Sequence, residues 1–178
     1  MVGDERIRLF CALRLPDDAL DALVAWQLSH LRGARIVPRG NLHVTLAFLG
    51  SRPAREVPAI ASSLAAAAVG ARDLRFRVRG YRETRSVGMV TFVDDGNRGR
   101  TLAERLFDGL EQLGVYRREA RPWLPHVTVL RFRERPRLDP PPPDLREVVP
   151  SDAAVYSSVL RSGGAQYEVL DAFALGGR

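Results

Sequence analysis

The chain has 178 residues and an apolar fraction of 46%, which suits one soluble core or two small lobes that share one. No apolar run approaches the ~20 residues of a membrane span. Its net charge is +6, and all 27 basic residues are arginine. Without lysine, the chain cannot form a P-loop or a covalent lysine adduct. The excess of arginine fits either phosphate-rich partners or a coding bias.

The N-terminal residues and the cysteine count bear on the compartment. Residues 1–6 mix acidic and basic side chains, which argues against a signal peptide. Cys11 is the only cysteine, so no intramolecular disulfide can form, as is typical of a reducing compartment. We therefore expect a cytoplasmic protein that does not enter a membrane.

The first half of the chain predicts strands alternating with helices. Residues 6–15 read as a strand, and a helix capped by Asp17 or Asp18 is expected to follow it. A strand at 41–49 and an alanine-rich helix at 54–69 come next. The residues expected on the buried face of the first helix are Leu20, Leu23, Val24, Leu28 and Leu31.

The second half begins with residues 74–81, where apolar side chains alternate with arginines and predict a strand with one buried face. Another strand is expected at 87–93. A third helix should begin with a capping box formed by Thr101 and Glu104. The leucines expected on its buried face are Leu102, Leu106, Leu110 and Leu113.

The last third of the chain predicts a strand at 124–132, then a loop or arm at 136–150, where six prolines gather. Residues 153–160 and 166–175 read as a β-hairpin that turns at Gly163-Gly164. The mixed order of elements predicts an α+β fold in which helices pack against antiparallel sheets. No linker separates the parts, so we expect residues 1–178 to form one domain.

The tripeptide His-Val-Thr occurs twice, at His43 to Thr45 and at His126 to Thr128. Residues i and i+2 of a strand point to the same face, so each copy presents an imidazole beside a hydroxyl. The two copies lie about 80 residues apart and suggest two related halves, each a β-α-β type unit. Two histidines facing each other would supply an acid and a base for phosphodiester chemistry, and the threonine hydroxyls would hold phosphate oxygens.

A single His-x-Thr is more often a hydrogen-bonded strand histidine, but the repetition favours catalysis. A metal site is the weaker alternative, because it needs a third ligand and no candidate among His30, Cys11 or the carboxylates has ligand spacing. His30 has no threonine partner and is expected on the surface.

The segments 41–50 (NLHVTLAFLG) and 125–131 (PHVTVLR) resemble the paired signatures of the two-histidine phosphoesterase superfamily, and most closely its RNA 2′,3′-cyclic phosphodiesterase branch, also called 2′-5′ RNA ligase. Further parts of the chain resemble this branch in the same order, so the resemblance covers nearly its whole length. These parts are residues 8–16, 35–38, 156–160 and 167–170.

The resemblance implies a bilobal α+β fold with a pseudo-twofold axis and a central cleft. It also implies an enzyme that hydrolyses a terminal 2′,3′-cyclic phosphate to a 2′-phosphate without metal, ATP or other cofactor. By position, His43 would be the general acid and His126 the general base, while Thr45 and Thr128 would hold the phosphate. The near symmetry also permits the reverse roles. We expect a monomer with RNA as its partner.

Several alternatives share these residues. The same site could join RNA ends by a 2′-5′ linkage, or open a small cyclic nucleotide such as ADP-ribose cyclic phosphate. From a different class, the chain could be a non-catalytic RNA-binding module in which the histidines only hold phosphate. Loss of turnover on removing both histidines would distinguish an enzyme from such a module.

Arg131 matches the arginine that follows the second motif in this family, and it would clamp the phosphate. It lies five residues after His126, so a regular strand would place it on the opposite face, and it reaches the site only if the strand bulges or ends first. Phe48 has the equivalent offset from His43. Phe48 could stack on a base, although a core position is the more common one for such an aromatic.

Other basic and aromatic residues are weaker candidates. Arg75, Arg77 and Arg79 form a stripe on one strand face that could follow an RNA backbone or simply protect a solvated sheet edge, and Arg82 and Arg85 lie close behind it. Beside the second motif, Trp123 and Tyr116 could stack on an RNA base or simply pack against the neighbouring strand. The arginines just before this motif, Arg117, Arg118 and Arg121, could extend the basic cleft.

Overall fold

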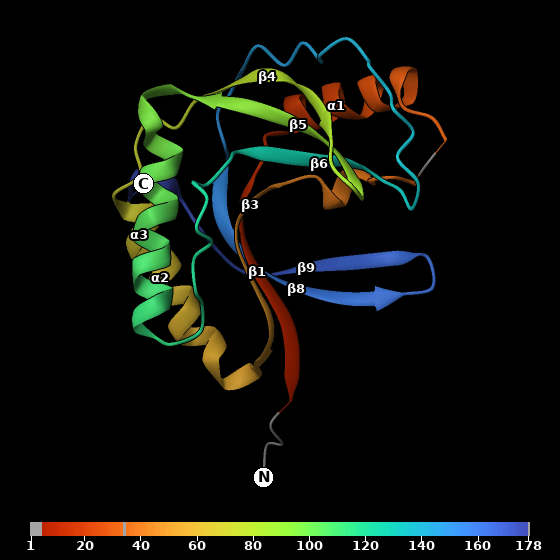
Figure 1. Cartoon of the computed structure of the whole chain (residues 1–178). Coiled ribbons are helices and arrows are strands. Elements are labelled where there is room, and N and C mark those ends of the chain that lie inside the picture. Colours follow the sequence, from red (N-terminus) through yellow and green to blue (C-terminus); the bar gives the residue numbers. More distant parts are fainter. Residues whose placement is uncertain (1–4, 34, 178) are drawn as a thin grey trace.

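The computed structural model describes residues 5–33 and 35–177, and its strands join in one antiparallel sheet (Figure 1). The strand order is β7-β4-β5-β6-β3-β1-β8-β9, and β2 pairs with β6. The strands are β1 (Arg6–Arg14), β2 (Arg35–Ile36), β3 (Val44–Pro53), β4 (Phe76–Glu83), β5 (Val87–Asp94), β6 (His126–Arg131), β7 (Glu147–Val148), β8 (Asp152–Arg161) and β9 (Gly164–Phe173). The helices are α1 (Asp17–His30), α2 (Val57–Val69) and α3 (Arg98–Gln112).

The order of the strands is pseudo-symmetric about the centre of the sheet. Outward from the centre, β3, β1 and β8 on one side correspond to β6, β5 and β4 on the other, and each half carries one His-Val-Thr copy next to the centre. The halves meet in the register at a single pair, Val44 with Val127. The predicted α+β fold with two antiparallel, pseudo-twofold-related halves is therefore confirmed, and the two halves share one sheet.

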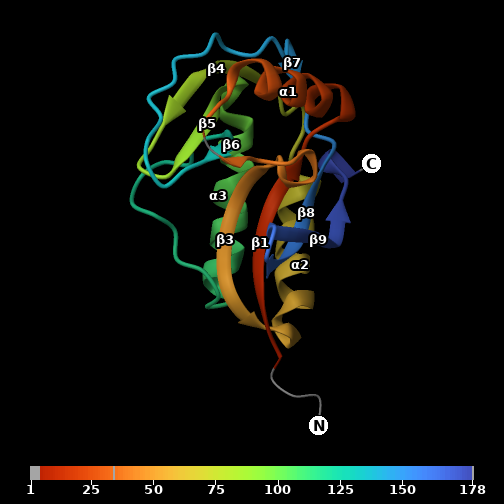
Figure 2. The same cartoon turned by 90° about the vertical axis from the view of Figure 1, so that its right-hand side faces the viewer.

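The helices cover the two halves unequally. In Figures 1 and 2, α2 and α3 lie side by side against the half that contains β1, β3 and β8, whereas α1 lies over the half that contains β4, β5 and β6. The buried Gln27 of α1 fixes this second contact, because its amide donates to the carbonyls of Val37 at 3.0 Å and Val129 at 2.9 Å. A buried amide with two satisfied donors orients the helix on the strand that carries the second motif.

The predicted cap and buried face of the first helix are partly wrong. Pro16 occupies the N-cap of α1 and no side chain caps it, so neither Asp17 nor Asp18 has that role. Leu28 is 72% exposed. The helix instead buries a face made of Ala19, Leu23, Trp26 and Gln27.

The capping box of the third helix is also wrong. The helix α3 begins earlier, at Arg98, so Thr101 lies inside it and donates to the carbonyl of Asn97 at 3.0 Å. Asp94 takes the capping role, because its carboxylate accepts from the amides of Gly99 at 2.9 Å and Arg100 at 2.8 Å. Leu102, Leu106 and Leu110 are buried as expected, but Leu113 is 42% exposed because the helix ends before it.

The proline-rich segment 136–150 follows the outside of the second half. The indole of Trp26 donates to the carbonyl of Pro141 at 2.7 Å, and the amide of Leu138 donates to the Glu83 carboxylate at 3.0 Å. The strand β7 then adds this segment to the edge of β4. No residue of 136–150 lines either cavity that contains a motif histidine.

Candidate active site

His43 lies directly before β3 and is held in place by the backbone. Its Nδ1 is 2.8 Å from the carbonyl oxygen of Asn41, and its Nε2 is 3.0 Å from Oγ1 of Thr45. A carbonyl oxygen can only accept, so Nδ1 carries the proton and Nε2 is left to exchange a proton with a ligand. The predicted proximity of imidazole and hydroxyl is confirmed for this copy.

His126 begins β6 and repeats the same arrangement. Its Nδ1 is 2.8 Å from the carbonyl oxygen of Leu124, again two residues back, so Nε2 is again the nitrogen left to exchange a proton. Thr128 follows on the same strand, half-buried and paired with Met89 of β5. The two copies therefore share a ring orientation that their own backbone imposes.

A β-bulge follows each motif at the same position. In β3, Thr45 pairs with Ala12 and Ala47 pairs with Cys11, so Leu46 is the extra residue. In β6, Thr128 pairs with Met89 and Leu130 pairs with Gly88, so Val129 is the extra residue. Each bulge lies three residues after its histidine. An inserted residue reverses the alternation of faces beyond it, which re-aims the side chains that follow.

The bulges decide the positions of Arg131 and Phe48. Beyond them, the fifth residue after each histidine returns to the cleft face, and both Arg131 and Phe48 line the cavity that contains His43 and Thr45. The condition under which Arg131 could reach the site is met. The core position considered for Phe48 is wrong, because its side chain is 54% exposed.

Two cavities meet at the site. One of about 800 Å³ contains His43, and one of about 650 Å³ contains His126. Thr45 and Phe48 line both, so the cavities adjoin along β3. A ligand group held at Thr45 would therefore lie between the two histidines, as acid-base catalysis on a single phosphorus requires.

Aromatic rings surround His43. Its ring stacks on Phe10 with centroids 4.8 Å apart and meets Tyr167 edge-on at 5.5 Å, and Tyr156 stacks behind Phe10 at 4.8 Å. Burial against these rings disfavours the charged form and lowers the pKa of His43 to about 4, with smaller contributions from the charges of Arg131 and His126. His43 is thus neutral at pH 7 in the free protein.

His126 has a more polar and more basic setting. Partial burial is the main cause that lowers its pKa, and the charges of Arg82 and Arg121 lower it further. Both arginines line the same cavity as His126, together with Glu119, which pairs with Arg121 at 2.6 Å. Both histidines are therefore kept neutral, one chiefly by aromatic packing and the other by burial next to cations.

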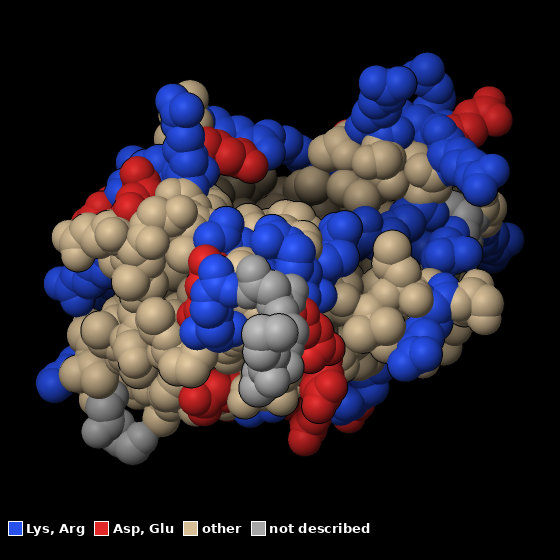
Figure 3. Space-filling view, turned by 90° about the horizontal axis from the view of Figure 1, so that it is seen from below, with Lys and Arg blue, Asp and Glu red and all other residues tan. Residues whose placement is uncertain are grey.

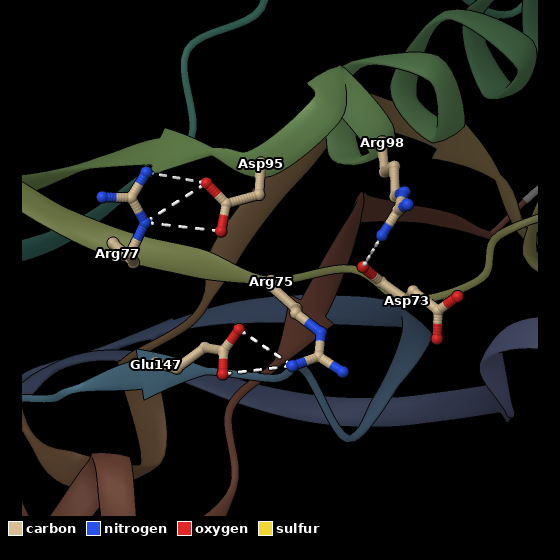
Figure 4. Close-up of polar contacts among 6 residues, drawn as sticks. All are labelled: Asp73, Arg75, Arg77, Asp95, Arg98 and Glu147. Atoms are coloured by element: carbon tan, nitrogen blue, oxygen red, sulfur yellow. Dashed lines mark hydrogen bonds and ion pairs between the residues drawn. The ribbon is translucent and has the colours of Figure 1, made fainter.

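Two members of the arginine stripe, Arg75 directly before β4 and Arg77 within it, are paired with carboxylates, as Figure 4 shows. Arg75 pairs with Glu147 at 3.0 Å and Arg77 pairs with Asp95 at 2.8 Å. These contacts indicate that Arg75 and Arg77 protect a solvated sheet edge and argue against a role for this pair in binding an RNA backbone. Arg82, further along the strand, is the member of this basic segment that lines the cavity beside His126.

The aromatic and basic candidates before the second motif divide in the same way. Trp123 lines the His126 cavity, but its indole donates to the carbonyl of Thr45 at 3.0 Å, which makes it part of the wall. Tyr116 also lines this cavity and packs on Phe107. Arg118 forms ion pairs with Asp108 and Glu111 on α3, and so it does not extend the cleft.

Cys11 and His30, the candidates for a third metal ligand beside the two motif histidines, lie in environments that do not suit that role. Cys11 is fully buried in the main core, where burial raises the pKa of its thiol to about 12. His30 lies at the end of α1 beside Trp26. Within residues 5–33 and 35–177, no three His, Cys, Asp or Glu side chains are grouped so that they could hold a metal ion.

Several residues that surround His43 or line its cavity carry no signal in the local sequence. Phe10, Tyr156 and Tyr167 come from β1, β8 and β9, whose pairing in the sheet brings them together. Three arginines, Arg8, Arg35 and Arg161, line the same cavity. The alternation in β1 hints that Phe10 and Ala12 share a face, but no local signal connects that face to His43.

Comparison with known proteins identifies the family. The sequence model of the 2′-5′ RNA ligase superfamily matches residues 15–159. The chain belongs to this superfamily. It is 36% identical to an RNA 2′,3′-cyclic phosphodiesterase of Thermus thermophilus over 96% of this chain and 91% of that one. It is 29% identical to the Escherichia coli protein of the same description, over 94% and 96% of the two chains.

Solved structures of two bacterial proteins share the fold. A crystal structure from Thermus thermophilus superposes with a TM-score of 0.81 at 34% identity, covering 96% of this chain and 99% of that one. Escherichia coli LigT in complex with NADP+ gives a TM-score of 0.82 at 26% identity, covering 96% and 98%. In the part of this chain that the structure describes, no helix has the length and apolar character of a membrane span.

Proposed function

We propose that this protein hydrolyses the 2′,3′-cyclic phosphate at the end of an RNA strand and leaves a 2′-phosphate. The observation that carries the proposal is the duplicated histidine geometry: each Nδ1 is fixed by a backbone carbonyl, which leaves each Nε2 for proton exchange, and the two histidines line two adjoining cavities. The relatives in Thermus thermophilus and Escherichia coli are both described as RNA 2′,3′-cyclic phosphodiesterases, which supports the same substrate here.

The proposed reaction needs one base and one acid. Nε2 of His126 takes a proton from water as the water oxygen bonds to phosphorus. The bond from phosphorus to O3′ breaks, and Nε2 of His43 gives its proton to O3′. The product carries a 2′-phosphate and a free 3′-hydroxyl, and solvent restores both histidines to their starting protonation.

The acid must carry a proton that the free protein does not hold near neutral pH. Because burial lowers the pKa of both rings, the bound phosphate has to raise the pKa of one of them. The phosphate anion beside Nε2 of His43 would do this, since an opposite charge at close range favours the imidazolium. Substrate binding and proton uptake are then coupled.

The neighbouring side chains would orient the phosphate. Thr45 and Thr128 would donate to its oxygens, and Arg131 would neutralise charge that develops as water attacks. Phe48, exposed between the two cavities, would stack on the terminal base. None of these roles requires a metal, so we expect turnover to continue in EDTA and without ATP. We further propose that the whole chain acts as one cytoplasmic, monomeric domain.

The cavity beside His126 supports a second reaction. It has a volume of about 650 Å³, which is large enough for a nucleoside, and it lies beside the proposed base. If a 5′-hydroxyl of another RNA strand replaced water there, the same bond changes would join the strands through a 2′-5′ linkage. Hydrolysis and ligation would then differ only in which hydroxyl occupies this cavity.

The test is incubation of the pure protein, in EDTA and without ATP, with a short RNA that ends in a 2′,3′-cyclic phosphate. We expect a 2′-phosphate product from wild type and none from H43A or H126A. A second reaction should contain excess RNA with a 5′-hydroxyl to reveal ligation. Equal activity in all three proteins would point to a contaminant, and RNA binding without turnover would support the binding-module alternative.

A further inference from the structure

The His43 cavity carries more positive charge than one phosphate needs. Arg8, Arg35, Arg131 and Arg161 all line it, and the described residues of its lining include no aspartate or glutamate. Figure 3 shows arginine side chains spread over the right-hand part of the face seen from below, on the side toward which the β8–β9 hairpin extends in Figure 1. A cavity lined by cations without counterions favours an anionic ligand.

These four arginines differ from many others in the chain. Within the described residues, none of the four forms an ion pair. Elsewhere arginines commonly have carboxylate partners, for example Asp152 for Arg14 and Glu56 for Arg52. The absence of such partners around this one cavity leaves the guanidinium groups available for a ligand.

The backbone also brings two of these arginines together. Arg35 of β2 stands directly opposite Arg131 of β6. Like charges directly opposite each other destabilise a pair of strands, so this pairing is favourable mainly when an anion lies between or beside them. Arg131 belongs to the proposed site for the reacting phosphate, which leaves Arg35 for a further anion.

The remaining arginines extend the positive lining away from His43. Nη1 of Arg35 reaches the hairpin turn, within 3.5 Å of the position that a Cβ on Gly164 would occupy, and Arg161 pairs with Gly164 across that turn. Arg8 lies over the ring of Phe48 with its guanidinium carbon 5.4 Å from the centroid. The amide of Asn41, two residues before His43, donates to the carbonyl of Ala165 at 2.9 Å and holds the hairpin against the site.

From this arrangement we infer that the cavity holds the phosphodiester immediately 5′ of the terminal ribose, with Arg35 and Arg161 as its main ligands. The inference rests on the proposed function. A strand that ends in a 2′,3′-cyclic phosphate has all its other phosphates on the 5′ side, so a second anion next to the reacting one must be that phosphodiester. The substrate class is therefore an RNA strand of at least two nucleotides in preference to a cyclic mononucleotide.

The test compares two dinucleotides that both end in a 2′,3′-cyclic phosphate. One has a natural phosphodiester between its nucleosides, and the other has an uncharged methylphosphonate. For wild type we expect kcat/KM to be about tenfold or more higher with the charged linkage, mainly through KM, as a charge-assisted contact would give. In R35Q and R161Q this preference should fall toward one, because the substituted side chain no longer carries a charge that can contact the charged linkage.

The matched control is R72Q, which removes the same charge from an exposed residue of a different cavity. It should keep the full preference for the charged linkage. Salt gives an independent measurement: kcat/KM for the charged dinucleotide should fall less steeply with increasing salt in R35Q than in wild type, because one screened charge contact is lost.

The outcomes separate this inference from the function on which it rests. Turnover of both dinucleotides at equal kcat/KM, unchanged in R35Q and R161Q, would overturn the inference and leave the proposed function intact. If no cyclic phosphate is turned over, the function fails, and calorimetric binding of the corresponding 2′-phosphate dinucleotides still decides the inference. Equal Kd values for the charged and uncharged forms would then overturn it.

Discussion

The two halves of the site have the same backbone and different surroundings. In both halves a carbonyl two residues back holds the histidine ring, and a bulge three residues later turns the next side chains toward the cleft. Around His43 the neighbours are Phe10 and Tyr167, whereas around His126 they include Arg82 and Arg121. The ring orientation is thus duplicated, while the environment that sets each proton affinity is not.

This difference shows how a near-symmetric fold can perform an asymmetric reaction. One proton must leave and another must arrive, so two identical environments would give the histidines no reason to divide the roles. Phe48 and Arg131, which occupy equivalent positions after the two bulges, differ in the same way: one is an aromatic ring and the other a cation. The following experiments test whether each half has the separate role that its neighbours suggest.

The largest expected effect comes from removing either imidazole. H43A and H126A should each lower kcat by about 10²–10⁴-fold, the usual contribution of a positioned acid or base. The double variant should lose less than the product of the two single losses, because the groups act in one step. Steady-state kinetics on the RNA dinucleotide measure this. Near-wild-type turnover in either single variant would show that only one half is catalytic.

The pH dependence should separate the two histidines. The pKa of His43 is lowered to about 4 and that of His126 is also lowered, so kcat/KM, which reports the free enzyme, should peak below pH 6.5. Above the higher pKa the acid loses its proton and kcat/KM falls about tenfold per pH unit. The optimum of kcat should lie at higher pH, because bound phosphate raises both pKa values.

The single variants then assign the roles. If His43 is the acid, the residual activity of H43A should lose the fall at high pH, and that of H126A should lose the fall at low pH. The opposite pattern would reverse the assignment. Activity that rises steadily from pH 5 to 9 in wild type would contradict paired acid-base catalysis.

The equivalent pair Arg131 and Phe48 should give smaller and different effects. R131Q should lower kcat/KM by about 10–100-fold with a reduced kcat, since a charge-assisted contact to the reacting phosphate strengthens as the reaction proceeds. F48L should raise KM by about tenfold and leave kcat nearly unchanged, as expected for loss of base stacking. If both variants changed only KM, the two residues would be equivalent in function as well as in position.

The smallest effect is expected from the paired end of the arginine stripe. Arg77 already pairs with Asp95, so R77Q should change kcat/KM by less than about twofold. R82Q, on the same strand, removes a charge beside His126, and because that charge lowers the pKa of His126, the pKa should rise in this variant. Histidine NMR titration of both variants measures the difference. A substantial loss of RNA turnover in R77Q would instead support the interpretation that the arginine stripe binds the RNA backbone.

Much of the site could be predicted from local sequence. The repeated His-x-Thr pattern picked out both histidines as candidates for the site. The alternation of residues 74–81 correctly located a half-buried strand. The glycines at 163–164 correctly located a hairpin turn. These features depend on neighbours a few residues away, which the sequence displays directly. The helix caps were less predictable, because Asp94 reaches the start of α3 from a turn before it and displaces the expected Thr101 box.

The sequence by itself determined the chemistry: two imidazoles, two hydroxyls, abundant arginine and strands to carry them. Only the tertiary structure decided which of these residues work together. Whether Arg131 and Phe48 face the cleft depends on two β-bulges, each of which inserts one extra residue between strands that are distant in sequence. Whether an arginine is free depends on partners such as Glu147, which lies 72 residues from Arg75. Strand pairing and charge pairing are properties of the folded chain, so local sequence patterns alone could not supply them.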